Sequence, residues 1–538
     1  MTFMLVPALN GATSIDITGD GERVQLQSLD GVVNIFVDNY VWIMSTNMNG
    51  AGIVGSNKRL GGTMTAKSGP LKGLRVLEIG SSVAGPFCGR LLADFGANVI
   101  KVEPIEGDAV RTMSKRVRGR SLYAASIFRN KRLVAIDLRT EAGRDLVRRM
   151  AARSDIMIEN FRPGTLEKWG MGYDVLAREN PKLVLVRISG FGQGGPYRDR
   201  AGYGIIGEAM SGLRHLTGDP DRPPGRVNTS LTDEVTGLYA AFGAMMAIVA
   251  RQWTGRGQCV DATLYESAFS LIEPHVPAFG SLGVIAQRAG SRLPDSAPNN
   301  LYPTRDGRHI HITAMADSVF ARLAAAIGRP EFSADPRYAT AISRSANEEA
   351  LDAAITGWTR NHDLADAEKT LEAAGVPASR IYDIADIFRD PHYRARDMLL
   401  EVPDAELGSV TVAGVVPKLS ETPGSVAHLG GSPGQDTASV LQEVLAHHLA
   451  DAPGVDEPVQ HVHEHGARTA LARDAEQLRD GLLVDLVDAS GIQHASSSSA
   501  RSSRSPGVAA RLHLLFVPNT RRPPPLPGAD GVLPVRHT

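Results

Sequence analysis

Two acidic residues, Asp233 and Glu234, stand at the start of a long apolar run. The stretch "SLTDEVTGLYAAFGAMMA", from Ser230 to Ala247, is typical of a helix that opens with polar residues. Acids in a first helical turn commonly cap the helix, and Ser230 and Thr232 are also able to accept from its free backbone N–H groups. The same helix dipole can instead keep a partly buried carboxylate ionised, as a nucleophile requires. These residues alone leave both interpretations open.

Two glycine-rich stretches follow predicted strands and are candidates for holding a phosphate or an oxyanion. "GSSVAGP" lacks the Lys-Ser/Thr pair of a P-loop. "GFGQGG" matches the dinucleotide fingerprint, but "PYRDR" stands where the third glycine should open a helix, which disfavours NAD binding. Backbone N–H groups around Gly190 and Gly192 are suited to an oxyanion, and a plain glycine turn is the alternative.

Cationic residues gather in two runs that flank predicted strands. "RTMSKRVRGR" contains Arg111, and "FRNKR" contains Lys131. Guanidinium and ammonium groups near strand ends are suited to the phosphates of a ligand. A charge run is more commonly just a solvated surface.

Histidine and cysteine offer little further chemistry. "HVHEH" lacks the spacing of a zinc-binding helix, so we expect no metal site. His309 and His311 alternate as residues on one face of a strand do. Cys88 has no partner placed by the sequence, so we expect a packed thiol.

The elements that must position these residues alternate along the middle of the chain. Apolar strand patterns such as "LRVLEIG", "NVIKVE", "IMIENF" and "KLVLVRIS" are separated by helical patterns such as "EAGRDLVRRMAARS". Buried Val, Ile and Leu strands separated by helices predict a parallel sheet covered on both faces. This is a Rossmann-like α/β fold. Ligands of such sheets lie at the carboxyl ends of strands, here the loops after Ile79, Glu103, Asn160 and Ser189.

The composition excludes several classes of function. The chain has 538 residues, 43% hydrophobic and 22% charged, with a net charge of -2, which argues against a dedicated nucleic-acid binder. Its two cysteines exclude a disulfide framework and fit a cytoplasmic location. The first residues lack a secretory signal. The longest apolar stretch, Leu238 to Ala250, is shorter than the roughly 20 residues that cross a bilayer, so we expect no membrane span.

Composition also predicts the domain organisation. Residues 1–70 contain strand-like pieces such as "VVNIFVDNYVWIM" and remain an unassigned extension. We expect a large Rossmann-like domain over 71–289, a smaller α/β domain over 290–390 and a return segment over 391–445. Residues 446–538 contain "ASSSSARSSRS" and "RRPPPLPG", low-complexity stretches that predict a disordered tail.

Taken in order, the motifs resemble a known family. "LRVLEIGSSVAGPFCGRLLADFGANVIKVE", "FRNKRLVAIDL", "IENFRPGTLEKWGMGYDVL", "LVRISGFGQGGPYRDRAGY", "LTDEVTGLYAAFGAMMAI" and "GRGQCVDATLYES" are similar to segments of the class III CoA-transferases, the formyl-CoA and carnitine (CaiB/BaiF) type. The similarity covers about residues 71 to 445. It implies the family's fold, with an interlocked homodimer, and an enzyme that moves coenzyme A between carboxylic acids.

The resemblance also implies roles for particular residues. An aspartate at the start of a helix is the family's nucleophile, and by motif this is Asp233. Coenzyme A, a substrate and not a resident cofactor, is expected along the strand ends. Its expected contacts are Asn160, Phe161, Arg162, Arg111 and Lys131, with Gly190 and Gly192 in the loop that binds the oxyanion.

Departures from the family patterns narrow the range of expected reactions and substrates. Racemases of the same fold carry a His 30 residues before the Asp, where this chain has Tyr203, a poor base at neutral pH. Formyl-CoA transferases carry a Gln at the position of Val83, so formyl or oxalate specificity is not expected. "SGLRHLTGDPDRPP" is more similar to the branch that uses succinyl-CoA and small dicarboxylic acids. The alternatives are a 2-methylacyl-CoA racemase or a non-catalytic CoA-binding or NAD-binding protein.

Overall fold

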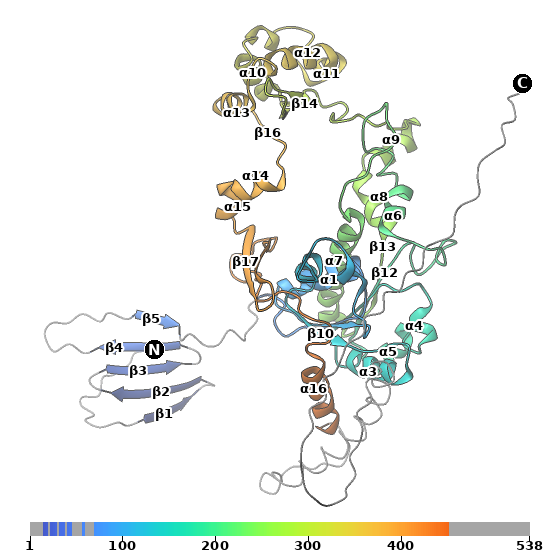
Figure 1. The fold of residues 1–538 in the computed structure, drawn as a ribbon, viewed down its shortest axis with the longest axis vertical. Coiled ribbons are helices and arrows are strands. Elements are labelled where there is room, and N and C mark those ends of the chain that lie inside the picture. Colours follow the sequence, from blue (N-terminus) through green and yellow to red (C-terminus); the bar gives the residue numbers. More distant parts are fainter. Residues whose placement is uncertain are drawn as a thin grey trace, which may run out of the picture. The chain divides into compact units, whose positions relative to one another are not determined.

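A computed structural model describes residues 14–19, 22–29, 32–37, 40–45, 56–59 and 69–450 (Figure 1). All of them belong to one compact unit, Met1–Ala452. The predicted disordered tail and the "HVHEH" motif lie outside the described residues. Near the amino terminus, five antiparallel strands pair in sequence order: β1 (Ser14–Gly19), β2 (Glu22–Leu29), β3 (Val32–Val37), β4 (Tyr40–Ser45) and β5 (Ser56–Arg59). The strand pattern seen in "VVNIFVDNYVWIM" is thus confirmed as β3 and β4.

The middle of the chain builds a six-stranded parallel sheet in the order β10-β7-β6-β11-β12-β13. Every residue of β11 and β12 is buried, as expected for apolar strands covered on both faces. The predicted Rossmann-like sheet is confirmed. Its strands are β6 (Arg75–Glu78), β7 (Asn98–Glu103), β10 (Lys131–Ala135), β11 (Ile156–Glu159), β12 (Val184–Ser189) and β13 (Cys259–Thr263).

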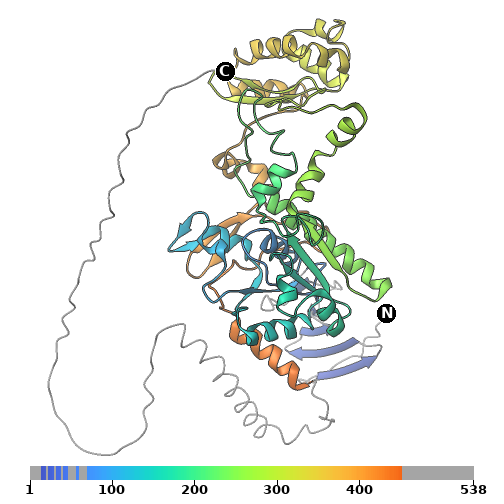
Figure 2. The same ribbon diagram turned by 90° about the vertical axis from the view of Figure 1, so that its right-hand side faces the viewer.

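Helices cover the two faces of this sheet (Figure 1 and Figure 2). Because side chains of a strand alternate between faces, Val76 packs in one core cluster and Leu77 in another. The first cluster contains residues of α1 (Ala84–Asp94) and α7 (Leu231–Thr254). The second contains residues of α3 (Glu141–Ala151), α5 (Tyr173–Glu179) and α16 (Thr437–Ala450).

Helices α1 and α7 pack with their backbones almost in contact. A Cβ on Gly237 of α7 would lie 2.8 Å from the carbonyl oxygen of Ala84, so a side chain at this position would push the helices apart. Helix α7 is long and apolar enough to cross a membrane by length and composition, a test that buried core helices also pass. Its alanines at 240, 244 and 247 are buried in the core beside α1.

The rest of the chain adds a second α/β layer and a return to the large sheet. Strands β14 (Asn299–Pro303), β15 (His309–Thr313) and β16 (Ala378–Arg380) form an antiparallel sheet that shares a core with α10 (Asp317–Ala326), α12 (Glu348–Thr359) and α13 (Leu364–Ala373). After it come α14 (Ile384–Arg389), α15 (Pro391–Ala395) and the hairpin of β17 (Leu399–Asp404) and β18 (Gly408–Ala413). Shorter elements are η1 (Ala109–Thr112), β8 (Arg116–Val117), β9 (Arg120–Ser121), α2 (Leu122–Ile127), α4 (Thr165–Lys168), α6 (Gly204–Met210), α8 (Leu264–Phe269), η2 (Ser270–Ile272), α9 (His275–Leu282), η3 (Pro330–Ser333) and α11 (Ala341–Ala346).

The strand order reverses between β6 and β11. From β6 the chain adds β7 and β10 toward one edge, and it then returns to add β11, β12 and β13 toward the other edge. In open parallel sheets the ligand crevice lies at the carboxyl ends of the strands beside such a reversal. Of the loops predicted to carry the site, those after β6 and β11 are therefore where we expect the ligand crevice.

Candidate active site

Asp233 lies where the first turns of two helices meet. It stands in the first turn of α7, and its carboxylate touches Gly204, the first residue of α6. A Cβ on Gly204 would lie 2.0 Å from Oδ2 of Asp233, so only glycine fits beside this carboxylate. The positive ends of two helix dipoles therefore stand next to one acid.

The surroundings make Asp233 more basic than an ordinary aspartate. Burial, with a smaller contribution from the charge of Glu234, raises the pKa of Asp233 from 3.8 to about 6, although its own backbone N–H and the Arg226 guanidinium act in the opposite direction. At pH 7 the group is mostly ionised. A carboxylate that is ionised yet weakly solvated is suited to attack a carbonyl carbon.

The polar residues around Asp233 do not cap the helix as expected. The side chain of Ser230, the N-cap residue, makes no capping hydrogen bond, and the buried Oγ1 of Thr232 has no hydrogen-bond partner among the described residues. Of the two interpretations left open by the sequence, capping of α7 by these two side chains is therefore wrong. Glu234 turns instead toward α2, where the Tyr123 hydroxyl donates to its Oε1 over 3.4 Å. Burial raises the pKa of Glu234, against the charge of Arg90.

The glycine-rich loop after β12 passes close to this carboxylate. A Cβ on Gly190 would lie 2.7 Å from the Cα of Gly202, two residues before Gly204, so the two segments cross at glycines. Gly192 has a φ of +93°, a conformation that favours glycine. Its N–H donates to Oγ of Ser189 over 2.9 Å, so in this structure it faces the protein and does not fit the expected role of oxyanion donor.

A cavity of about 330 Å³ lies along the same glycine-rich loop. Its lining includes Phe191, Tyr197, Asp261 and Tyr265. Asp261 of β13 accepts from the Gln193 backbone N–H over 2.7 Å, which ties the loop to the edge strand of the sheet. Burial raises the pKa of Asp261, against that hydrogen bond.

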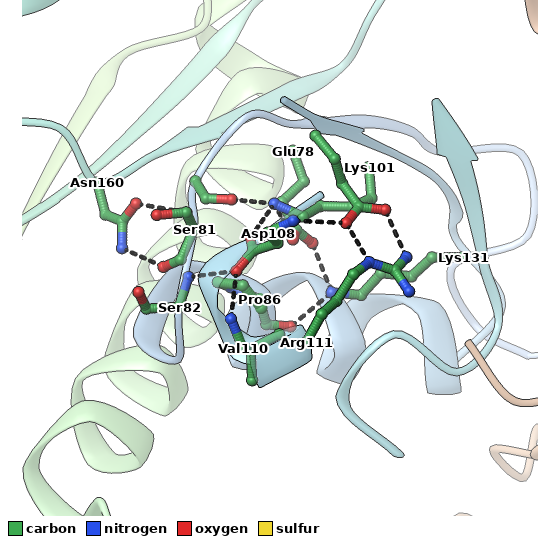
Figure 3. Close-up of polar contacts among 12 residues, drawn as sticks. Glu78, Ser81, Ser82, Pro86, Lys101, Asp108, Val110, Arg111, Lys131 and Asn160 are labelled. Atoms are coloured by element: carbon green, nitrogen blue, oxygen red, sulfur yellow. Dashed lines mark hydrogen bonds and ion pairs between the residues drawn. The ribbon is translucent and has the colours of Figure 1, made fainter. Parts of the chain in front are cut away.

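Buried and half-buried side chains hold the backbone of the loop after β6 and of the first turn of α1 at successive points (Figure 3). Asn160 accepts from the Ser81 N–H over 2.7 Å and donates to the Ser81 carbonyl over 2.8 Å. Asp108 accepts from the Ser82 N–H over 2.9 Å. Lys101 donates to the carbonyl of Gly80, and Lys131 donates to the carbonyl of Pro86 over 2.6 Å. The loop is therefore positioned from both sides of the crevice, with Asn160 bridging the two strands at which the order reverses.

The two lysines that hold this loop form ion pairs with acidic side chains inside the core. Lys101 contacts Asp108 at 2.9 Å and Glu78 at 3.6 Å, and Lys131 contacts Glu78 at 2.7 Å. Burial alone would lower the pKa of Lys101, but the charges of Asp108 and Glu78 and the hydrogen bond to Asp108 together outweigh burial and raise that pKa. The side chain of Lys131 is fully buried in this structure, and its predicted contact with coenzyme A stays a prediction.

The other predicted ligand-binding residues follow the ends of β7 and β11. Arg111 makes two 2.6 Å hydrogen bonds to Glu103 at the end of β7 and a third to the carbonyl of Gly431. Phe161 packs edge to face against Trp169 with 5.1 Å between ring centroids, and Arg162 is exposed. A direct role of these residues toward coenzyme A stays a prediction.

Sequence reasoning missed Arg187, which clamps the loop after β11. Its Nε donates to Glu159 and its Nη1 to Glu167, each over 2.7 Å. Glu159 in turn accepts from the Phe161 N–H over 2.7 Å, and burial raises its pKa to about 7 against the hydrogen bond from Arg187. The signal for this pair was a charged residue within each of two apolar strands, "IMIENF" and "KLVLVRIS".

Among the described residues, Cys88, His309 and His311 lie in a helix and a strand. Cys88 is fully buried in α1, and the prediction of a packed thiol is confirmed. His309 and His311 lie on β15, where Nε2 of His311 is 2.8 Å from Oδ1 of Asn299. Within the part of the chain that the structure describes, no group of three or more His, Cys, Asp or Glu side chains is arranged to hold a metal ion.

Comparison with known proteins identifies relatives over the same region. A family model described as CoA-transferase family III matches residues 71–437. The succinyl-CoA–D-citramalate CoA-transferase of Chloroflexus aurantiacus is 47% identical over 70% of this chain and 94% of its own length. The beta subunit of succinyl-CoA–L-malate CoA-transferase from the same organism is 42% identical over 70% of this chain and 94% of its own length. A crystal structure of a CaiB/BaiF family protein from Brucella suis is 35% identical, with a TM-score of 0.63, over 70% of this chain and all of that one.

Proposed function

Since this chain belongs to CoA-transferase family III, we propose that it moves coenzyme A from succinyl-CoA to a small dicarboxylic acid through a covalent intermediate on Asp233. The donor and the class of acceptor are supported by the names of the two relatives from Chloroflexus aurantiacus. The observation that carries the mechanism is the partly buried carboxylate of Asp233 at two helix starts, with a pKa raised to about 6.

The first half-reaction transfers coenzyme A to the enzyme. An oxygen of the Asp233 carboxylate attacks the thioester carbonyl of succinyl-CoA, the C–S bond breaks, and coenzyme A leaves as a thiolate with the electron pair. The product is a mixed anhydride of succinate and Asp233. The thiolate then attacks the Asp233 carbonyl, the anhydride C–O bond breaks, and succinate leaves as a carboxylate. Asp233 now carries coenzyme A as a thioester.

The second half-reaction runs these steps in reverse with the acceptor. The acceptor carboxylate attacks the Asp233 thioester, releases the thiolate and forms a second mixed anhydride. Attack of the thiolate on the acyl carbonyl of the acceptor breaks the anhydride and frees the Asp233 carboxylate. Proton transfer is not needed, and the energy of the thioester is retained only while water is excluded from both activated intermediates.

The crevice between the loops after β6 and β11 is the proposed place for coenzyme A. Asn160 fixes the Ser81 backbone, while Phe161 and Arg162 stand on the opposite loop. Arg162 is exposed and is the group best placed there for a phosphate. We assign no oxyanion role to Gly192, because its N–H is bonded within the protein.

We propose that two copies of the chain associate. Helix α7 carries a second apolar stripe whose members are 42–72% exposed: Leu238, Phe242, Met246, Val249 and Trp253. Their spacing of three or four residues places them on one side of the helix. Apolar residues on α9 continue the exposed surface, with Phe279 at 58% and Leu282 at 77%. Exposed apolar residues of this kind are typical of a subunit interface, so we expect a homodimer. The two cysteines fit a cytoplasmic location.

Trapping the intermediate tests the proposed function. The protein is incubated with succinyl-CoA and then with hydroxylamine, and the modified residue is located by peptide mass spectrometry. We expect a hydroxamate on Asp233, and none in Asp233→Asn. Modification of another residue, or normal turnover of the variant, would refute the mechanism.

Two assays separate the alternatives to this function. Deuterium exchange at the α-carbon of 2-methylacyl-CoA without exchange of coenzyme A would favour the racemase, which Tyr203 in place of a His argues against. Binding of coenzyme A without any transfer by the wild type would favour a binding protein.

A further inference from the structure

Arg187 joins two acids at the carboxyl end of β12. Arg187 and Glu159 are direct neighbours across the parallel strands β11 and β12, and Nε of Arg187 donates to Glu159 over 2.7 Å. Its Nη1 and Nη2 donate to the two carboxylate oxygens of Glu167, in α4, over 2.7 and 3.2 Å. The Arg187 side chain is 7% exposed. We call these three side chains the clamp, because one buried guanidinium ties the end of β11 to the helix that follows it.

The clamp encloses the loop after β11, residues 160–164. At the start of this loop, Glu159 also accepts from the Phe161 backbone N–H over 2.7 Å. At its end, the Arg162 carbonyl accepts from the N–H of Thr165, the first residue of α4, over 3.1 Å. The backbone of the loop is thus held at both ends, and the clamp fixes those ends to each other.

Arg162 is the cation that this loop presents. Its side chain is exposed, and among the described residues it forms no ion pair and donates no hydrogen bond. Asn160, two residues earlier, is bonded to the Ser81 backbone across the reversal of strand order. Arg162 therefore stands on a fixed backbone beside the place proposed for coenzyme A, with its guanidinium available to an anion.

We propose that Arg187 is a positioning residue for coenzyme A. By fixing both ends of the loop after β11, it places the Arg162 guanidinium to bind a phosphate of the substrate. This inference rests on the proposed function. Coenzyme A is common to the donor, the enzyme thioester and the product, so one phosphate contact serves both half-reactions. Arg187 is buried between two acids and acts through Arg162 without touching the substrate.

A purely structural role for Arg187 predicts a different pattern of effects. Loss of a residue that only stabilises the fold would affect every substrate alike. Loss of a residue that positions Arg162 would affect only substrates that carry phosphates, and it would also remove the contribution of Arg162. Because a loop that is ordered before binding pays less entropy on binding, the effect is expected in KM and not in kcat.

The variants must open the clamp without leaving a buried charge unpaired. Arg187→Gln alone would leave the carboxylate of Glu159, which is 1% exposed, without its cation. Arg187→Gln combined with Glu159→Gln removes both charges, and an amide at position 159 still accepts from the Phe161 N–H. Glu167→Gln is a milder variant, because the Glu167 side chain is 47% exposed and the pair of Arg187 with Glu159 remains.

A matched pair of donors tests the proposal. We would measure kcat/KM with succinyl-CoA and with succinyl-pantetheine, which has the same thioester and no phosphate. The double variant Arg187→Gln, Glu159→Gln is expected to lower the value for succinyl-CoA by about 10-fold, through KM, and Glu167→Gln by about threefold, with succinyl-pantetheine within about twofold of wild type in both. Arg162→Gln should show the same selectivity, and adding it to the double variant should cost no more than about a further twofold. Arg148→Gln, at an exposed ion pair of α3, is the control and should change neither value.

The outcomes separate this role from the proposed function. Equal losses with both donors, no loss with either, or fully additive losses from the double variant and Arg162→Gln would each overturn the role of Arg187 while the proposed function stands. Binding of free coenzyme A, measured by calorimetry, should weaken by the same factors and needs no turnover. A wild type that binds coenzyme A but transfers it between no pair of acids would overturn the proposed function, and the binding data would then decide the role of Arg187.

Discussion

Replacing Asp233 with Asn should make the protein more stable and inactive at the same time. Burial disfavours the ionised form of this carboxylate, so its pKa is raised from 3.8 to about 6 in the folded chain. A group whose folded pKa exceeds its unfolded value stabilises the fold at pH below the unfolded value and loses that contribution as the pH rises through the folded value. Above pH 6 the wild type therefore carries a penalty that a neutral amide of the same shape does not.

The magnitude follows from the size of that pKa change. A rise from 3.8 to about 6 corresponds to at most about 3 kcal/mol of unfolding free energy at pH 8, and partial solvent contact reduces this. At pH below 3.8 both side chains are neutral, so the difference between variant and wild type should disappear. The gain of Asp233→Asn is thus expected to grow between about pH 4 and pH 6 and to stay constant above.

Denaturant unfolding of both proteins across this pH range measures the difference in their free energy of unfolding. One fixed protein concentration is used, because subunit association adds to stability. Asp137→Asn is a control of opposite sign, because the Arg139 side chain lowers the pKa of Asp137. That variant should lose stability at neutral pH. If Asp233→Asn is equally stable or less stable than the wild type at pH 8, the carboxylate is not held against a desolvation penalty and the reasoning fails.

Further predictions follow from the same site and its supports. Activity should fall as the pH drops through about 6, where Asp233 takes up a proton. Glu234→Gln should move this limb of the pH profile to lower pH, because the charge of Glu234 raises the pKa of Asp233, whereas that of Arg226 lowers it. Gly204→Ala should lower kcat by about 100-fold, because the new Cβ would displace the Asp233 carboxylate. As its control, Gly357→Ala in α12, where a Cβ meets nothing within 4 Å, should leave kcat unchanged and raise stability by about 0.5–1 kcal/mol. Asp108→Ala should destabilise the protein by about 3–5 kcal/mol in denaturant unfolding, because it leaves the buried Lys101 without its closest acidic partner. As the control, Asp219→Ala at an exposed ion pair should change stability by less than about 1 kcal/mol.

The parallel sheet could be predicted because its strands are apolar along their whole length. "KLVLVRIS" contains β12, and "LRVLEIG" contains β6, each within a residue or two of its ends. Strands buried on both faces show this pattern without any knowledge of their neighbours. The position of Asp233 at the start of α7 was equally visible, since polar residues precede a long apolar run.

The ion pairs that Lys131 and Arg111 form within the protein could not be predicted from the local sequence. Lys131 and Arg111 belong to basic runs of the kind that is usually solvated, yet each pairs with an acid at the end of another strand. Glu78 is 53 residues from Lys131 along the chain, so only the strand order reveals the pair. Likewise, Asn160 meets Ser81 across 79 residues, because β6 and β11 become neighbours only where the order of the sheet reverses.

The reversal of strand order between β6 and β11 also explains how the poorly solvated side chain of Asp233 keeps its position. The charges that fix the loop after β6 pair with one another inside the core while they hold the backbone of residues 80–86. That loop leads into α1, whose Ala84 carbonyl lies against Gly237 one turn beyond Asp233. Buried ion pairs stabilise a fold only weakly. Their contribution here is geometric: the first turn of α7 rests on a surface that the pairs keep rigid, and Asp233 remains in place although no side-chain cap secures it.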